Sequence, residues 1–436
     1  MIIENINSPG SSAEHITFFI ILQILIILFF SRIISSLARR YLGQTNVAGE
    51  ILAGILLGPS FLASLFPETF HMIFIEDTAI VFTGLSQIGL IFLMFQIGME
   101  FNFSLQLKGA GRSFIVISIA GIAIPFLIGY ISAGYIWQQL PAPAPPEEGF
   151  RLFFAVAMSI TAIPILGRIF MELNYSNTRI AALVISAAAV DDVIGWLLLG
   201  IITALVTTGF DFPVTINNLI LLISFIFISL IIGSRFISPW IAKKIATSET
   251  ISPTLLFTVI SGLFINSLAT SFLGVYAIIG GFIFGLSLHK NRKFVQRWNE
   301  TIGYFVNIFF LPLFFAWTGL KTNIGLLTTL PDILLCLAIC FLAFIGKFGG
   351  TYLASRLTGE KHNDALIVGF SMNTRALMEL IVLNVGYDLG ILPQKIFTML
   401  VVMAVSSTFI ITPILKYLLK KNSRHVLFTR QTSAKW

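Results

Sequence analysis

The chain has 436 residues, of which 56% are hydrophobic and only 11% are charged, and its formal net charge is +7. Soluble proteins carry about 25% charged residues, so this composition excludes a soluble globular protein and predicts a protein of the lipid bilayer. The positive charge does not indicate nucleic-acid binding, because the basic residues are scattered through short connections between apolar segments.

Apolar segments recur along the whole chain, and a bilayer-spanning helix needs about 20 such residues. They predict an all-α integral membrane protein of about thirteen transmembrane helices. The predicted helices cover 15–38, 46–58, 78–99, 113–136, 151–171, 179–206, 216–238, 252–272, 274–289, 299–318, 331–355, 364–386 and 394–419.

Lys and Arg concentrate in alternate connections, which orients the chain. The basic connections contain Arg39, Arg40, Lys108, Arg112, Lys243, Lys244, Lys290, Arg292, Lys293, Arg297, Arg356 and Lys361, and the tail after 415 is also basic. The opposite connections are acidic or neutral. The positive-inside rule therefore predicts an external N-terminus, a cytoplasmic C-terminus and an odd number of spans. We expect no cleavable signal peptide, and a tail of fifteen residues after Lys421 that is too short for a nucleotide-sensing domain.

Several predicted helices contain polar residues that a lipid environment disfavours. Glu50 lies in the apolar segment 46–58, whose glycines indicate tight packing. The segment 151–171 contains Ser159, Thr161 and Pro164. Because proline removes a helical hydrogen bond, this helix is expected to be kinked or broken, and a broken helix would expose carbonyls and hydroxyls to a cation.

Asp191 and Asp192 are adjacent near the middle of the segment 179–206. A charge in hydrocarbon costs at least ~2.5–3.5 kcal/mol, so such residues indicate function. Consecutive helical residues point about 100° apart, which predicts that one aspartate faces a water-filled cavity, where protons and hard cations compete for it, while the other pairs with a basic group. The alternative is that the two aspartates form hydrogen bonds with helix ends or neighbouring backbone.

Lys347 lies in the middle of the segment 331–355, beside Gly346. A buried lysine needs an anion, and Asp191 or Asp192 is the expected partner. A structural salt bridge and a role in transport are both compatible with this pair.

The segment 364–386 also has a polar centre. Arg375 and Glu379 are one helical turn apart, which favours a local, structural ion pair. Asn373 and Thr374 are expected to cap two half-helices if this helix is broken. Broken, polar helices in two different halves of a chain are typical of inverted-repeat transporters.

Other chemistry has little support. The two cysteines, Cys336 and Cys340, are one turn apart in an apolar segment, and the five histidines lie in loops or at segment ends. This disfavours a disulfide framework, a metal centre and a histidine relay. Nucleotide-binding and hydrolase motifs are absent, so neither a cofactor nor an enzymatic activity is expected.

Taken together, the motifs resemble the second class of monovalent cation:proton antiporters, which includes bacterial sodium/proton antiporters and plant cation/proton exchangers. The resemblance covers about residues 15–420. It is carried by Gly-Glu-Ile-Leu-Ala-Gly-Ile-Leu-Leu-Gly-Pro (49–59), Asp191-Asp192, Pro-Leu-Phe-Phe-Ala-Trp-Thr-Gly-Leu-Lys-Thr (312–322), Gly346-Lys347 and Met-Asn-Thr-Arg-Ala-Leu-Met-Glu-Leu (372–380).

This resemblance implies inverted repeats with two crossed, discontinuous helices at 151–171 and 364–386. It implies scaffold or dimerisation helices at 1–112 and 207–330 (the latter including a linker helix), a mobile core built from 113–206 and 331–421, and a cytoplasmic tail at 422–436. It also implies a homodimer and elevator-type movement of the core against the scaffold.

By motif position, Asp192 resembles the carboxylate that carries the cation or proton, and Asp191 the partner of Lys347. Thr161, with Ser159, is expected to line the ion site. Arg375, Glu379, Asn373, Thr374, Pro164 and Glu50 are interpreted as structural or gating residues.

The predicted function is exchange of Na⁺, or alternatively K⁺, for protons across the bacterial inner membrane, with a role in pH homeostasis. The double aspartate with lysine resembles the sodium branch of the family, whereas 312–322 and 372–380 resemble plant exchangers and relatives linked to potassium. A cation channel or a sodium-coupled symporter that uses the same aspartates as ion ligands is the alternative.

Overall fold

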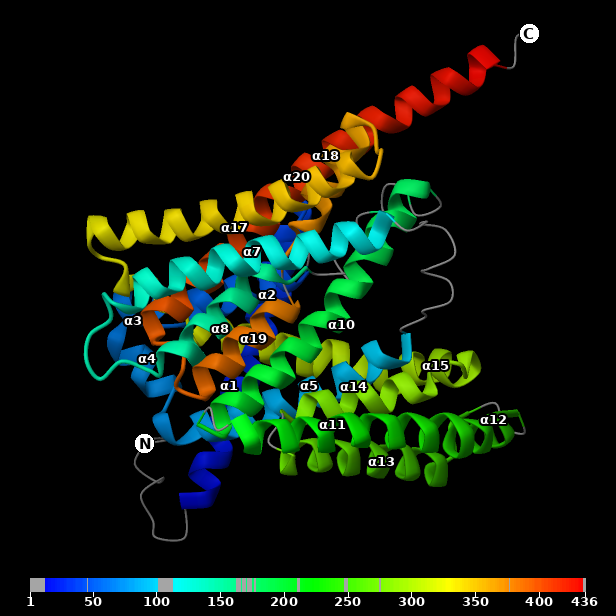
Figure 1. Ribbon diagram of the computed structural model, residues 1–436. Coiled ribbons are helices and arrows are strands. Elements are labelled where there is room, and N and C mark those ends of the chain that lie inside the picture. Colours follow the sequence, from blue (N-terminus) through cyan, green and yellow to red (C-terminus); the bar gives the residue numbers. More distant parts are fainter. Residues whose placement is uncertain are drawn as a thin grey trace. The chain divides into compact units, whose positions relative to one another are not determined.

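The structure is a computed structural model that describes residues 12–433, except for 45, 101–112, 162–165, 167–169, 171–174, 176–177, 210–211, 247–249, 274–275 and 376. Every regular element in the described part is helical (Figure 1). This confirms the predicted all-α class. The chain divides into two compact units, each built from segments that are distant in sequence.

Unit 1 comprises residues 1–37, 49–102 and 203–323. Its helices are α1 (Ser12–Leu42, whose end from Ala38 belongs to unit 2), α2 (Asn46–Leu57, whose first three residues belong to unit 2), α3 (Leu62–Leu65), α4 (Pro67–Ile73), α5 (Ala79–Glu100), α11 (Phe212–Ile232), α12 (Ser238–Ala246), α13 (Pro253–Phe272), α14 (Ala277–Leu288), α15 (Arg292–Trp298) and α16 (Leu311–Lys321). Three π-helical stretches join them at Gly233–Ile237, Asn299–Gly303 and Val306–Phe310.

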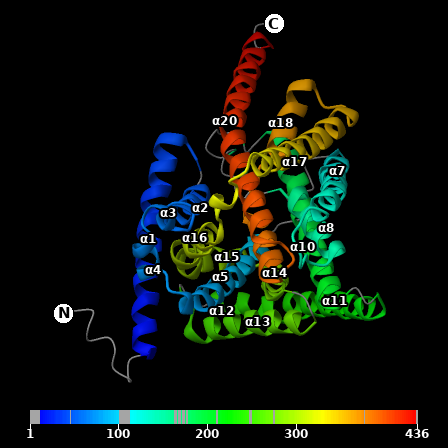
Figure 2. The ribbon, with the colours of Figure 1, turned by 90° about the vertical axis from the view of Figure 1, so that its left-hand side faces the viewer.

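Unit 2 comprises residues 38–48, 103–202 and 324–436. Its helices are α7 (Ser113–Trp137), α8 (Glu147–Ser159), α10 (Arg179–Thr207, whose last turn belongs to unit 1), α17 (Leu330–Leu357), α18 (His362–Met372), α19 (Leu377–Asp388) and α20 (Gln394–Ser433). Within this unit α7 packs along both α8 and α17 (Figures 1 and 2).

Nine helices in the described part are long and apolar enough to cross a membrane, and a tenth candidate is a helix pair bent by 45° between Arg292–Gly303 and Val306–Leu326. Each of the thirteen predicted segments overlaps one or more helices. However, α8, α14, α18 and α19 have only 11–13 residues each. A total of thirteen spans therefore stays a prediction.

Unit 1 is held together by close backbone contacts at glycines. A Cβ atom at Gly54 of α2 would lie 2.0 Å from the Ala316 carbonyl oxygen of α16, and a Cβ at Gly285 of α14 would lie 2.1 Å from the Phe95 carbonyl oxygen of α5. Only glycine permits such approaches, which are typical of helix packing in lipid, where small residues let backbones come together.

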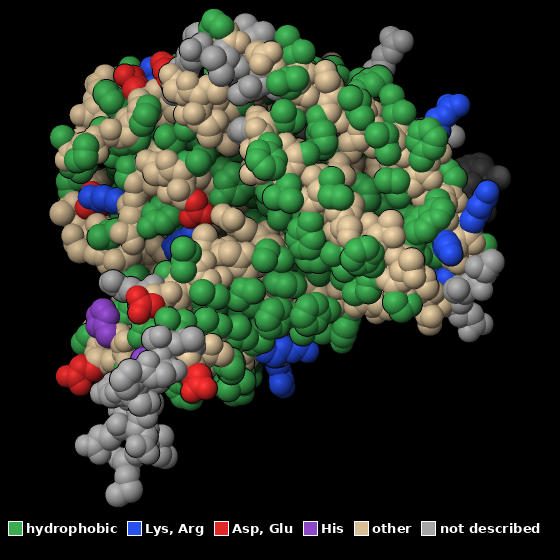
Figure 3. Space-filling view, turned by 90° about the horizontal axis from the view of Figure 1, so that it is seen from below, with side chains coloured by type: hydrophobic (Ala, Val, Ile, Leu, Met, Phe, Trp, Pro, Cys, Tyr) green, Lys and Arg blue, Asp and Glu red, His purple; other side chains and the backbone are tan. Residues whose placement is uncertain are grey.

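The surface of unit 1 is strongly apolar. Phe227 on α11 and Phe257 and Phe272 on α13 are each more than 65% exposed. Figure 3 shows hydrophobic side chains spread over one face of the molecule, with few charged groups among them. Such a surface is unfavourable in water and matches the hydrocarbon of a bilayer.

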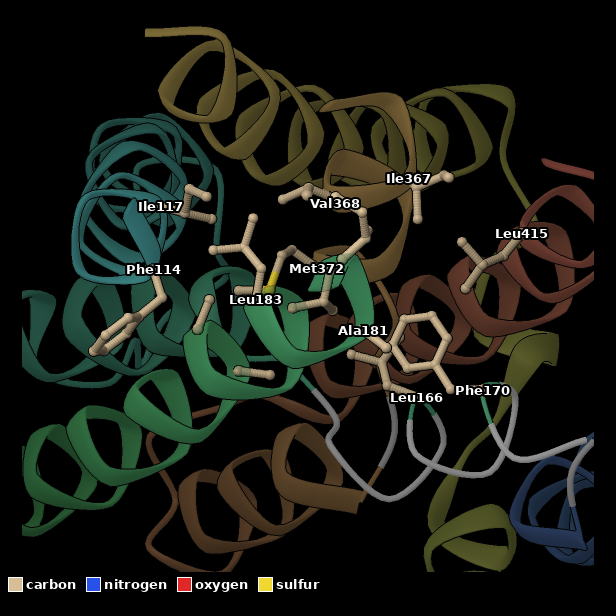
Figure 4. Packing of buried hydrophobic residues seen from close by; sticks show 14 of the residues in the cluster. Phe114, Ile117, Leu166, Phe170, Ala181, Leu183, Ile367, Val368, Met372 and Leu415 are labelled. Atoms are coloured by element: carbon tan, nitrogen blue, oxygen red, sulfur yellow. The ribbon is translucent and has the colours of Figure 1, made fainter. Parts of the chain in front are cut away.

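Unit 2 has a hydrophobic cluster that fixes the end of α18 beside α10. In Figure 4, Ile117 of α7, Leu183 of α10, Met372 of α18 and Leu415 of α20 all contribute to this cluster. Met372 is the last residue of α18, so the packing holds the point where that helix stops.

Candidate functional site

The first break in unit 2 follows α8. This helix ends at Ser159, and Ile160 has an extended backbone with φ −84° and ψ 149°. The predicted segment 151–171 is therefore interrupted, while Pro164 lies outside the described residues. A helix that stops leaves its last carbonyls without intrahelical donors, and these must find other partners.

Two buried cations satisfy the carbonyls at the end of α8. Lys347 of α17 donates from Nζ to the Ser159 carbonyl. The Arg375 guanidinium donates to the carbonyls of Ala157 at 2.9 Å and Met158 at 2.6 Å. Both side chains are fully buried. Positive charge is favourable at a helix C-terminus, where the macrodipole is negative, so the break is stabilised by basic residues from distant parts of the chain.

The carboxylate of Asp191 accepts hydrogen bonds from three side chains. Lys347 Nζ lies 2.7 Å from Oδ2, Thr161 Oγ1 donates to Oδ2 at 2.9 Å, and Ser118 Oγ of α7 donates to Oδ1 at 2.6 Å. Asp191 itself is 1% exposed. The structure thus pairs Lys347 with Asp191, one of the two partners expected from the sequence, and places Thr161 in contact with it.

Asp192 differs sharply from its neighbour. It is also buried, at 8% exposure, but its Oδ1 atom has no hydrogen-bond partner among the described residues. Because adjacent helical residues point in different directions, Lys347 pairs with the carboxylate of Asp191 and not with that of Asp192. A buried carboxylate oxygen without a partner is costly unless a proton or a cation binds to it.

The second break separates α18 from α19, between Met372 and Leu377. The expected capping by Asn373 and Thr374 side chains is not seen within the described part of the chain, because neither side chain has a hydrogen-bond partner there. A backbone N–H and a hydroxyl from the other break lie at the end of α18 instead. The Thr374 N–H donates to the Ser371 carbonyl at 3.1 Å, and the Thr161 hydroxyl lies 2.9 Å from the Met372 carbonyl.

Arg375 and Glu379 form the expected ion pair at 3.4 Å, and both are buried. The shorter contacts of Arg375, however, are those to the carbonyls of α8. The interpretation of this pair as purely local was therefore incomplete, since the arginine ties the second break to the first.

Ser118 was not singled out from the sequence. A lone serine in the apolar helix α7 has no distinguishing local pattern, and only the fold reveals that it faces Asp191. Gly121, one turn later, belongs to the same face: a Cβ there would lie 3.8 Å from both Asp191 Oδ2 and Lys347 Nζ. Glu50 is buried in α2 of unit 1, whereas the other described site residues belong to unit 2, and its role stays a prediction.

Chemically, the site offers hard oxygen ligands in a buried setting. The open carboxylate of Asp192 lies in the same unit as the hydroxyl of Thr161 and the interrupted backbone of two helices. Oxygen donors of this kind suit hard cations rather than soft transition metals.

Comparison with known proteins agrees with a site that suits hard cations. A family described as "Sodium/hydrogen exchanger, transmembrane" matches residues 24–421. The Na⁺/H⁺ antiporter NhaS4 of Synechocystis is 35% identical over 396 residues, which are 91% of this chain and 96% of that protein. The cation/H⁺ antiporter 17 of Arabidopsis thaliana is 35% identical over 404 residues, which are 92% of this chain and only 48% of that protein, so the chain spans about half the length of the plant relative.

A solved structure supports the fold. The sodium proton antiporter MjNhaP1 of Methanocaldococcus jannaschii superposes with a TM-score of 0.60 at 18% sequence identity, covering 91% of this chain and 97% of the other. The chain therefore belongs to the sodium/hydrogen exchanger family and is a multi-pass membrane protein.

Proposed function

We propose that the chain exchanges a monovalent cation for protons across a membrane, with Na⁺ preferred and K⁺ as the alternative. Its family and the activities named for its Synechocystis and Arabidopsis relatives support this proposal. The observation that carries it is the inequality of two adjacent buried carboxylates: Asp191 accepts three hydrogen bonds, and Asp192 Oδ1 accepts none from the described residues.

In this mechanism a proton and a dehydrated cation compete for Asp192. The charges of Asp191 and Lys347 cancel, as do those of Arg375 and Glu379, so the empty site carries the single negative charge of Asp192. Moving an uncompensated charge through hydrocarbon is expensive. Binding of either H⁺ or the cation neutralises the site and lowers that barrier, so only loaded sites cross. Lys347 releases Asp191 as the cation binds and regains it afterwards.

The proposed transport cycle is elevator-type alternating access. Unit 2 contains the two helix breaks, the paired aspartates and the buried ion pairs, which supports its role as the mobile core, with unit 1 as scaffold and homodimer surface. We assign the two breaks to the crossed, discontinuous helices expected of an inverted repeat. We place the protein in the bacterial inner membrane, with the N-terminus outside and the C-terminus in the cytoplasm.

The test is Asp192→Asn in reconstituted liposomes. With an imposed Na⁺ or K⁺ gradient and an internal pH dye, exchange is expected to fall to the level of protein-free liposomes, because an amide binds neither a proton nor a cation as a carboxylate does. Asp388→Asn, at the exposed end of α19, is the matched control and should behave like the parent.

Exchange by Asp192→Asn at the parental rate would contradict this assignment. Cation flux through the parent without counter-movement of protons would instead favour the channel or symporter alternative. Thermal unfolding of the purified variants must show that both remain folded.

A further inference from the structure

The second helix break contains buried polar side chains that lack hydrogen-bond partners among the described residues. The side chains of Asn373 and Thr374 are completely buried, and neither the amide of Asn373 nor the hydroxyl of Thr374 has a hydrogen-bond partner among the described residues. Ser371 Oγ has none there either. Buried polar groups are nearly always paired, so an exception calls for an explanation such as an ion that the site binds.

Contacts on both sides hold this segment against the paired aspartates. On one side, the hydroxyl of Thr161 lies 2.9 Å from both the Met372 carbonyl and Asp191 Oδ2. On the other side, Gly195 of α10 faces the start of α19, since a Cβ there would lie 3.3 Å from Met378 Cε. Gly195 follows Asp191 and Asp192 by one helical turn, so Asn373, Thr374 and Arg375 lie between two contacts with the region of the two carboxylates.

Within this segment, Arg375 already has hydrogen-bond partners for its side chain and its carbonyl. Its guanidinium bonds the carbonyls at the end of α8, and its own carbonyl accepts from Thr408. The side chains of this segment that have no hydrogen-bond partner at all among the described residues are therefore those of Asn373 and Thr374. The unpartnered Oδ1 of Asp192 lies on the helical turn that this segment packs against.

We propose that the side-chain carbonyl of Asn373 is a ligand of the transported cation and sets its size preference, together with the hydroxyl of Thr374 and the carboxylate of Asp192. This inference rests on the proposed function. Neutral oxygen dipoles have a weaker field than carboxylates, and the number and strength of such ligands determine which monovalent cation best recovers its lost hydration.

The experiment measures the apparent KM for Li⁺, Na⁺ and K⁺ in proteoliposome exchange at a fixed pH. Asn373→Ala is expected to raise the KM for the preferred cation about tenfold, the effect of losing one interaction with a charged group, with little change in the maximal rate. Asn373→Asp is expected to shift the preference towards the smaller cations, because a second carboxylate strengthens the field.

Asn384→Ala is the matched control. Asn384 is also buried and also lies in this part of the chain, on α19, but its amide donates to the Leu380 carbonyl at 2.8 Å within its own helix. The KM ratios of Asn384→Ala between the three cations should equal those of the parent. Thermal stabilisation of purified protein by LiCl, NaCl and KCl gives a second readout that does not require transport.

If Asn373→Ala leaves all three KM values within about twofold of the parent, or if Asn384→Ala changes the KM ratios equally, the inference is wrong. Should Asn373→Ala fail to fold, Asn373→Ser decides the question: its smaller hydroxyl is expected to weaken salt-dependent stabilisation, and unchanged stabilisation overturns the proposal. Loss of exchange in Asp192→Asn combined with unchanged Asn373 variants would refute this inference alone. Parental exchange in Asp192→Asn would instead refute the proposed function.

Discussion

The two units of this protein are stabilised by different interactions. In unit 1 the helices α2 and α16, and likewise α5 and α14, approach until backbone touches backbone at Gly54 and Gly285. By contrast, all five ion pairs found within the described residues lie in unit 2, and two of these ion pairs are completely buried. The glycine contacts themselves contain no titratable group, although Glu50 is buried on α2, whereas the buried ion pairs of unit 2 are charged groups that a bound ion can affect.

This comparison suggests a division of labour. Helix contacts built from glycine and apolar side chains have no cost of desolvation and suit a part that keeps its structure throughout a cycle. Charged residues are retained in membrane proteins because they are functional, despite the free-energy cost of placing them in hydrocarbon. Three variants, ordered by expected effect, test whether the two units really depend on these different interactions.

The largest effect is expected for Lys347→Met in unit 2. It leaves Asp191 buried without its cation and the Ser159 carbonyl without its donor. Breaking one partner of a buried pair costs about 3–5 kcal/mol. Thermal unfolding in detergent should show a large loss of stability in Lys347→Met that Asp191→Asn, added as a second substitution, largely restores. Equal stability of the single variant and the parent would show that the pair does not stabilise unit 2.

The next effect concerns the glycine contacts of unit 1. A Cβ at Gly54 would overlap the Ala316 carbonyl, so Gly54→Val must force α2 and α16 apart and is expected to cost about 3 kcal/mol. Gly84→Val in α5 is the control, because a Cβ at Gly84 meets no atom within 4 Å. Indistinguishable unfolding temperatures for the two variants would mean that unit 1 does not depend on the close contact.

The smallest effect is expected for Ser118→Ala, which removes one charge-assisted hydrogen bond to Asp191 and should cost about 1.5 kcal/mol. Ser118→Thr keeps the hydroxyl and should recover most of this loss. Ser132→Ala, on the same helix, is the control, since the Ser132 hydroxyl donates to the Gly129 carbonyl of its own helix, one turn away. If the two alanine variants unfold alike, the serine contact to Asp191 contributes nothing.

Much of the fold could be predicted because hydropathy acts locally. Each apolar segment overlaps a helix, and the paired aspartates and Lys347 were identified by the cost of charge in hydrocarbon. Helix ends were harder to predict. The segment predicted to end at 238 continues in helical form through Lys243 and Lys244 to Ala246, since long basic side chains at a helix C-terminus complement its dipole and reach water.

The parts of the site that could not be predicted depend on contacts distant in sequence. Arg375 has a glutamate one turn away, and that local pattern indicated a simple ion pair. Its shorter hydrogen bonds go to carbonyls 217 and 218 positions earlier. For the same reason, the sequence suggested side-chain capping by Asn373, whereas a hydroxyl from the other broken segment lies against the end of α18.

The burial of the two cations that terminate α8 has a practical consequence. Dissolved salt screens exposed charges over about 10 Å at 0.1 M, but it hardly weakens pairs from which water is excluded. Lys347 and Arg375 are fully buried, so raising NaCl or KCl from millimolar to near-molar concentration should leave the architecture of the site intact. A salt titration then reports occupancy of the proposed cation site rather than ionic-strength damage.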